Sequence, residues 1–404
     1  MRREDESVGF SAERLERIST MLHGYVARGE LPGILAQVSR CGQVVYRQKF
    51  GLADIEDGKP IEYDTIFRLA SMTKPVVSAA VMMLYEEGHF HLNTPIANFI
   101  PAYKNTKVFV RETSDGMVLA DLEQPITFRH LFTHTSGLSY GNRDNEKDPV
   151  DRAYHAKQEQ MMLEGADPTV KGMVDALASL PLAFQPGTKW RYSLAIDVLG
   201  HLVEVISGTS LGEFLRTRMF EPLGMTDTGF FVPPEKAGRV ASVYTHSDRS
   251  KPLERMDIPV QTTPPSFESG GGGLFSTLHD YGRFAQMLVN GGILDGVRLL
   301  GPKTVELFSM NHAPSQALPY GFHEHDLYHA GYGYSLGTRV LMDVSQTGLP
   351  GSVGEFGWDG AFSTYFWVDP QEELYGLMML HHSPNAYYPV AQQFKQLTYQ
   401  ALVD

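Results

Sequence analysis

The hydrophobic and polar positions of this chain change their period along its length, and each period predicts a different kind of element. Residues 12–28 repeat apolar side chains at helical spacing, with Ser11 placed to cap the helix start. Residues 33–51 alternate instead, in two runs that meet at Cys41, which predicts a β-hairpin. Residues 71–87 are strongly apolar throughout, which predicts a buried helix.

The rest of the chain divides at about residue 265. Before that point the pattern predicts helices joined by long loops rich in proline, glycine and acidic residues. After it, the runs "GYGYSLGTRVLM", "AFSTYFWVD" and "LYGLMML" predict three strands, and residues 390–402 predict a last amphipathic helix.

These elements predict an α+β fold in two units. The N-terminal hairpin and the C-terminal strands most simply form one antiparallel sheet, covered by the two terminal helices. We expect a discontinuous α/β domain of residues 1–70 and 265–404 and a mostly helical domain of residues 71–264. The active site should lie in the cleft between them, because ligand sites favour such boundaries.

Composition narrows the class of protein. The net charge of -13, with no cluster of lysine and arginine, speaks against nucleic acid or an anionic membrane as a partner. Cys41 is the one cysteine, which excludes an internal disulfide and a thiolate metal cluster. The opening "MRREDESVGF" lacks the apolar core of a secretory signal, and no apolar run is long enough to span a membrane. We therefore expect a cytoplasmic protein; the sequence leaves its oligomeric state open.

The stretch "SMTK" places Ser71 and Lys74 one helical turn apart at the start of the apolar helix. Ser71 would direct its own N–H toward an anion held at the helix start. A lysine buried under apolar neighbours has a lowered pKa and can act as a base. A capping serine beside a surface lysine would produce the same spacing, so this pair alone decides nothing.

Two further stretches favour a catalytic role for this part of the chain. Tyr192 stands just before an apolar helix in "GTKWRYSLAIDVLG", where its hydroxyl can carry protons in acyl transfer. In "FGWDGAF", Trp358 and Asp359 precede Gly360 at the entry to a strand, and the N–H of Ala361 is a candidate oxyanion donor. Taken alone, Tyr192 would be a packing residue at a domain boundary.

In this order and separation, these elements resemble the penicillin-recognising serine hydrolases, in particular class C β-lactamases and family VIII carboxylesterases. The stretches "ITFRHLFTHTSGLSYG", "EPLGMTDTGF" and "GGGGLFSTLHDYGRFAQMLVNGG" extend the resemblance from about residue 10 to the end. It implies a sheet flanked by helices plus an all-helical lobe. It also implies Ser71 as nucleophile, Lys74 as general base, Tyr192 as proton carrier, and the N–H groups of Ser71 and Ala361 as the oxyanion hole.

Two departures from that pattern point to the substrate. The chain has Leu194 where β-lactamases have an asparagine, and Trp358 followed by Asp359 where they have a lysine that attracts the substrate carboxylate. We expect Trp358, Asp359, Gly360 and Tyr140 to contact the substrate, with the indole stacking on it and Asp359 repelling a carboxylate. These changes favour a neutral ester.

Three other sequence patterns are weaker evidence for a functional site. "GLSYG" at 137–141 matches the nucleophile elbow of α/β-hydrolases, but Ser139 lacks the preceding buried strand and the following helix. The histidines of "FHEHDLYH" follow no helical metal motif, and "SGGGGLFST" lacks the lysine of a phosphate-binding loop. We expect a rim loop at the histidines, and neither metal nor cofactor.

The sequence therefore predicts a serine carboxylesterase that hydrolyses small neutral esters through an acyl-enzyme on Ser71. The same residues would serve an acyltransferase, or a β-lactamase or D-amino-acid peptidase. A catalytically silent binding protein of the same fold is a further alternative.

Overall fold

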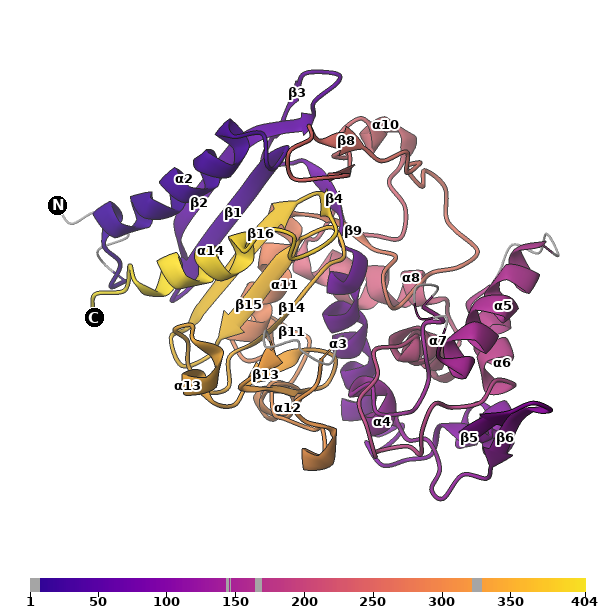
Figure 1. The fold of residues 1–404 in the computed structure, drawn as a ribbon. Helices are drawn as coiled ribbons and strands as arrows, with labels where there is room; N and C mark the ends of the chain where they lie inside the picture. The colour runs from indigo at the N-terminus through magenta and orange to yellow at the C-terminus, as the bar shows by residue number, and fades with distance from the viewer. Residues whose placement is uncertain (1–7, 143–144, 146, 164–168, 322–328) are drawn as a thin grey trace.

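A large antiparallel sheet lies at one side of the molecule, in the computed structural model that describes residues 8–142, 145, 147–163, 169–321 and 329–404 (Figure 1). Within those residues its eight strands run in the order β12-β13-β14-β15-β16-β1-β2-β3. The strands are β1 (Gly33–Arg40), β2 (Gln43–Asp54), β3 (Lys59–Pro60), β12 (Tyr332–Tyr334), β13 (Arg339–Leu341), β14 (Phe356–Asp359), β15 (Tyr365–Asp369) and β16 (Leu374–Leu380).

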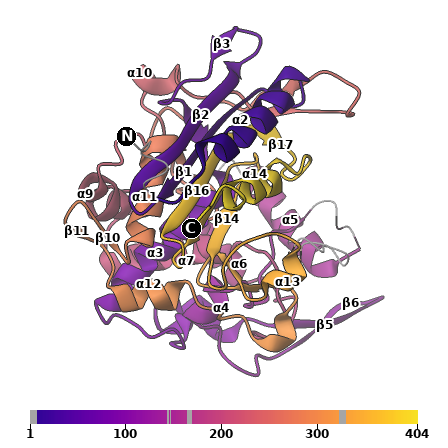
Figure 2. The ribbon, with the colours of Figure 1, turned by 90° about the vertical axis from the view of Figure 1, so that its left-hand side faces the viewer.

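The centre of the sheet joins the two ends of the sequence, as expected. Strand β1 pairs antiparallel with β16, from Ile34 opposite Leu380 to Arg40 opposite Leu374. Every residue of β16 is buried, because helices cover both faces of the sheet there. The helices α2 (Ala12–Ala27) and α14 (Val390–Tyr399) lie on one face, and α11 (Leu278–Val289) on the other (Figure 2).

The C-terminal strands differ in number from the three that we predicted. The run "GYGYSLGTRVLM" folds into two short strands, β12 and β13, which pair with each other. The residues "FGWD" form β14 on their own, so Trp358 and Asp359 end a strand instead of entering one. Glycines on both sides of these short strands hide them from a pattern that needs several alternating residues.

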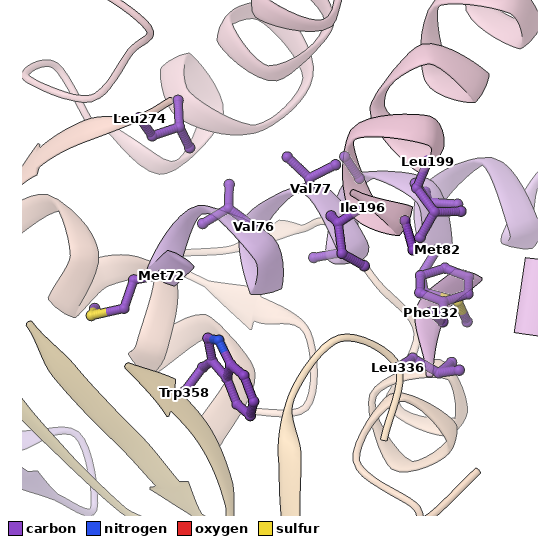
Figure 3. Close-up of a cluster of buried hydrophobic side chains, with 14 of the residues drawn as sticks. Met72, Val76, Val77, Met82, Phe132, Ile196, Leu199, Leu274, Leu336 and Trp358 are labelled. Atoms are coloured by element: carbon purple, nitrogen blue, oxygen red, sulfur yellow. The ribbon is translucent and has the colours of Figure 1, made fainter. Parts of the chain in front are cut away.

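The second part of the molecule is built on α3 (Thr73–Glu86), which packs against α7 (Ala195–Ser207). In Figure 3, Val77 of α3 lies beside Ile196 of α7 and Met82 of α3 lies beside Leu199, and the indole of Trp358 lies beneath the start of α3. The other helices of this region are α4 (Phe128–Phe132), α5 (Pro149–Leu163), α6 (Val170–Ala178), α8 (Leu211–Leu215), α9 (Glu221–Leu223) and α10 (Pro234–Ala237).

The expectation of an all-helical lobe was wrong, because residues 71–264 also contain strands. A β-hairpin of β5 (Val108–Thr113) and β6 (Gly116–Ala120) projects from this region (Figure 1). Most of its side chains are exposed, so it carries no apolar alternation that would have identified it. The division at residues 70 and 265 stays a prediction. Other short elements are α12 (Pro302–Phe308), α13 (Val344–Thr347), β7 (Tyr244–Thr245), β8 (Glu254–Arg255), β10 (Ile293–Leu294), β11 (Val297–Arg298) and β17 (His382–Ser383).

A small two-stranded sheet determines where the functional residues meet. Strand β4 (Ile66–Arg68) pairs antiparallel with β9 (Phe275–Thr277). The chain passes from β4 into Ser71, and it enters β9 from the glycines at 270–273. The pairing therefore holds two segments side by side that are about 200 residues apart in the sequence.

Candidate active site

Ser71 lies in a 3-10 turn, Ala70–Met72, that connects β4 to α3. The preceding residue, Ala70, has a φ of 46°, in the left-handed region that costs a non-glycine residue about 1 kcal/mol or more. Two hydrogen bonds hold this turn against the β9 segment: Leu69 N–H to Leu274 O at 2.9 Å, and Leu274 N–H to the Thr73 hydroxyl at 3.1 Å. The backbone around Ser71 is therefore fixed on both sides.

Lys74 is buried, and its amine lies in the position required of a base for Ser71. Its Nζ is 3.0 Å from Ser71 Oγ and 2.6 Å from the carbonyl oxygen of Gly271. Burial lowers the pKa of Lys74 to about 7, although the carboxylates of Asp197 and Asp359 oppose that shift. The lowered pKa makes the neutral amine accessible near neutral pH, and a neutral amine can accept the Ser71 proton.

Asp197, which we did not single out in the sequence, holds the partner of Lys74 in place. It is buried in the first turn of α7 and accepts hydrogen bonds from Gly271 N–H at 3.0 Å and Ser269 Oγ at 2.6 Å. These bonds hold Ser269 and Gly271, and thereby the residue whose carbonyl accepts from Lys74. An acid inside the apolar run "LAIDVLG" was the available signal, because buried carboxylates need partners.

Tyr192 lies over the same amine. Lys74 Nζ is 4.6 Å from the centre of the Tyr192 ring, and the hydroxyl interacts with Ser71. Burial raises the pKa of Tyr192, more than the hydrogen bonds from Ser71 and Trp358 lower it. Tyr192 is therefore a protonated phenol at neutral pH, suited to pass a proton on.

His134 supports Tyr192 and was also missed. It is buried with a φ of 53°, its Nδ1 is 3.2 Å from Ser193 Oγ, and its ring centre is 4.7 Å from that of Tyr192. Burial, followed by the charge of Lys74, lowers the pKa of His134 well below its usual value. A neutral imidazole therefore packs behind the tyrosine. The motif "HTSG" was quoted for the resemblance, but its histidine was not assigned a role.

Gly360 and Ala361 lie in the turn between β14 and β15, facing Ser71. A Cβ atom on Gly360 would be 2.4 Å from Leu69 O and 2.2 Å from Thr364 Oγ1, so only glycine lets this turn approach the Ser71 segment. The turn's hydrogen bonds run from Gly360 N–H to Thr364 O and from Ser363 N–H to Gly360 O, and Ala361 N–H takes part in neither. Ala361 and Ser71 line the same cavity.

Trp358 does not lie where we expected. Its side chain is 1% exposed, it is not among the residues lining the cavity, and its indole N–H donates to Tyr192 Oη at 3.3 Å. An indole packed beneath the tyrosine offers no face on which a substrate can stack. The expected stacking is therefore replaced by a role in orienting Tyr192.

Asp359 lines the cavity, but it is not an isolated negative charge. Arg339, whose side chain is buried, lies 3.2 Å from one of its oxygens, and Asn385 donates to the other at 3.0 Å. Burial raises the pKa of Asp359, and Arg339 opposes this. The expected repulsion of a carboxylate is thus weakened by a cation that the sequence pattern did not reveal.

The cavity in front of Ser71 has a volume of about 670 Å³. It reaches from Tyr192 and His329 past the Ala361 turn to the start of α14. Among the described residues lining it there is no lysine or arginine; its wall consists of Ser71, Tyr192, His329, Asp359, Ala361, Ser363, Tyr365, Met378, Ser383, Pro384, Asn385, Ala386, Tyr388, Val390, Ala391 and Gln392.

The residues of "GLSYG" have a structural role and do not form a nucleophile elbow. Ser139 donates a hydrogen bond to the buried carboxylate of Asp151, which also pairs with Arg191 at 2.7 Å. Ser139 therefore helps to hold the segment before Tyr192. Tyr140 lies near Lys74, whose Nζ is 5.6 Å from its ring centre, and it is not among the residues lining the cavity.

The candidate metal ligands of the histidine-rich stretch are only partly described. His323, Glu324 and His325 lie outside the described residues. The described part of the chain holds no group of three potential metal ligands. No helix in the described ranges is both long and apolar enough to cross a membrane.

The chain is similar to known proteins over most of its length. The chain is 37% identical over 364 residues to Protein Rv1367c of Mycobacterium tuberculosis, covering 88% of this chain and 87% of that protein. It is 30% identical over 398 residues to Esterase EstB of Burkholderia gladioli, covering 93% and 92%. Among solved structures, "EstCE1, a hydrolase with promiscuous acyltransferase activity" superimposes with a TM-score of 0.78 at 25% identity, covering 98% of this chain and 99% of that one.

The family model described as Beta-lactamase matches residues 18–400, nearly the whole chain. With the same fold as its structural relatives, this chain belongs to the beta-lactamase family of serine hydrolases.

Proposed function

We propose that this protein is a serine carboxylesterase that hydrolyses small neutral esters through an acyl-enzyme on Ser71. One observation carries the proposal: Ser71 and Tyr192 open onto a cavity whose described wall has no lysine or arginine. A β-lactam or a peptide C-terminus brings a carboxylate that such a wall does not bind. The relationship to Esterase EstB supports the same conclusion.

The chemistry uses the three clustered side chains in turn. Ser71 Oγ bonds to the ester carbonyl carbon while its proton passes to the neutral amine of Lys74. The oxyanion accepts hydrogen bonds from the N–H groups of Ser71 and Ala361. As the ester C–O bond breaks, Tyr192 gives its proton to the leaving alkoxide and recovers one from Lys74. Water then attacks the acyl-enzyme by the reverse proton route, releasing the acid and restoring Ser71.

An acyltransferase is the second candidate, because EstCE1 is described as a hydrolase with promiscuous acyltransferase activity. The first half-reaction would be the same, and an alcohol would replace water in the second. Adding methanol or butanol to the assay separates the two: transfer yields a new ester, whereas hydrolysis yields only the free acid.

The decisive comparison is kcat/KM for p-nitrophenyl butyrate and for a chromogenic cephalosporin on the wild-type protein. We expect the butyrate to be better by about tenfold to a hundredfold, because a missing charge-assisted hydrogen bond to the lactam carboxylate costs about 1.5–3 kcal/mol. Ser71→Ala is the control for background reaction. A cephalosporin that is the better substrate would make the chain a β-lactamase.

A further inference from the structure

A second cavity, of about 620 Å³, lies in the described part of the chain away from Ser71. It is bounded by residues 210–221, 225–233 and 264–268, and none of its lining residues also lines the catalytic cavity. Its apolar wall includes Ile66, Phe220, Met225, Phe230, Phe231 and Val232. A concave apolar wall with a few polar groups is typical of a small-molecule site.

The basic side chains at the rim of this cavity are already neutralised. Arg216 is paired with Glu213 at 2.7 Å and also with Glu221. Lys236 is paired with Asp227 at 2.7 Å. An incoming carboxylate or phosphate would therefore have to compete with carboxylates that the protein itself supplies.

Glu268 is different from the other acids that line the cavity. In the described residues no basic side chain lies within salt-bridge distance of it; its partners are Gly212 N–H, at 2.6 Å, and Ser210. Burial raises the pKa of Glu268, and the carboxylates of Glu204 and Glu213 raise it further. The cavity thus presents an apolar wall and a half-buried acid that lacks a countercharge.

We propose that this cavity is a second, non-catalytic binding site for a small molecule with an apolar body and a primary ammonium group. The apolar body would lie against Phe230, Phe231 and Val232, and the ammonium would bind Glu268. The four carboxylates at the rim outnumber the two basic groups, which favours a cation over an anion. A charge-assisted hydrogen bond to Glu268 would relieve the repulsion that it receives from neighbouring acids.

The proposed site is separate from the catalytic cavity, but it adjoins the residues that hold the hydrogen-bond partner of Lys74 in place. Glu268 precedes Ser269, which donates to Asp197, and Asp197 in turn holds Gly271 beside Lys74. A ligand bound at Glu268 therefore occupies neither the space nor the wall used by an ester at Ser71. Its binding must not be competitive with the ester.

The test is isothermal titration calorimetry of the wild-type protein with n-octylammonium at pH 7, compared with n-octanol and octanoate. We expect one octylammonium per chain, with octanol weaker and octanoate weakest. Glu268→Gln keeps a hydrogen-bond acceptor but removes the charge, and it should weaken octylammonium about tenfold or more while leaving octanol unchanged. Phe231→Ala should weaken octylammonium and octanol alike.

A matched control uses the other cavity. Ala391→Trp narrows the catalytic cavity and should leave the octylammonium affinity at its wild-type value. The proposal is overturned if octylammonium does not bind, or if Glu268→Gln binds it as tightly as the wild type. It is equally overturned if octylammonium inhibits ester hydrolysis competitively, since the ligand would then lie in the catalytic cavity.

Discussion

At the scale of single residues, the site depends on keeping an amine and a phenol in unusual surroundings. Lys74 is buried in the first turn of α3 with two hydrogen-bond partners, and the indole N–H of Trp358 donates to the hydroxyl of Tyr192. The amine loses its charge easily and the phenol keeps its proton, which is the combination that proton relay at Ser71 needs.

The pH dependence follows from the Lys74 pKa of about 7. Only the neutral amine accepts the Ser71 proton, so kcat/KM for p-nitrophenyl butyrate should rise with pH and reach half its plateau near pH 7. Lys74→Arg should lower kcat about a hundredfold or more, because arginine stays charged at every accessible pH. A pH profile that is flat from 5 to 9 would contradict the role of Lys74.

The two candidate serines can be separated by covalent labelling. Ser71→Ala should abolish both ester hydrolysis and reaction with a fluorophosphonate probe. Ser139→Ala should keep the label, because the Ser139 hydroxyl is buried and bonded to Asp151 and to Gly141 N–H, and it does not line the cavity. Mass spectrometry of the labelled peptide locates the adduct, and an adduct on Ser139 would refute the assignment of Ser71.

At the scale of elements, the β14–β15 turn sets the distance between the N–H groups of Ser71 and Ala361, which we propose as oxyanion donors. Gly360→Ala would place a methyl group 2.4 Å from Leu69 O, so the turn must move away from Ser71. We expect kcat to fall about a hundredfold, the usual effect of losing an oxyanion donor, while the protein remains folded by circular dichroism.

The control for that variant is Gly238→Ala. Gly238 has a φ of −62°, and an added methyl group there would have no neighbour within 4 Å, so the same substitution should leave kcat unchanged. Equal losses in both variants would show that the effect does not come from the turn.

The elements also show how far the sequence could predict the site. The helix capped by Ser11, the hairpin at Cys41 and the helix after Tyr192 were predicted correctly, because each has its own local pattern. The partners of Lys74 and Asp359 could not be predicted. Gly271 reaches Lys74 through the pairing of β4 with β9, two strands far apart in the sequence. Arg339 reaches Asp359 from β13, the neighbouring strand, which is too short to be recognised by its pattern.

The orientation of the Trp358 side chain could not be predicted from the sequence either. Its position in the motif was clear, but whether its indole faces the cavity or the core depends on what packs above it. Tyr192 occupies that place, and it comes from a segment more than 160 residues earlier in the chain.

At the scale of the whole molecule, the buried lysine links activity to stability. With a folded pKa of about 7 and an unfolded value of 10.5, Lys74 binds one proton fewer in the folded state between those two pH values. Its contribution to the free energy of unfolding therefore rises with pH across that window, by up to about 1.4 kcal/mol per unit.

The variant Lys74→Met isolates this contribution. Urea unfolding at pH 7, 8 and 9 should show the wild type gaining stability relative to Lys74→Met as the pH rises. The titrating groups that do not interact with Lys74 are shared by both proteins and cancel in the difference. A difference that is constant over the three pH values would mean that Lys74 keeps its proton in the folded protein.

The pairing of β1 with β16 has a consequence for biosynthesis. While the ribosome makes the chain, β1 and β2 emerge early, but the strand that completes the other side of β1 follows more than 300 residues later. Until then one edge of a hydrophobic strand has no partner, and such an edge invites association with other nascent chains. The yield of active protein should therefore depend on chaperone supply and on the rate of synthesis as well as on the stability of the finished fold.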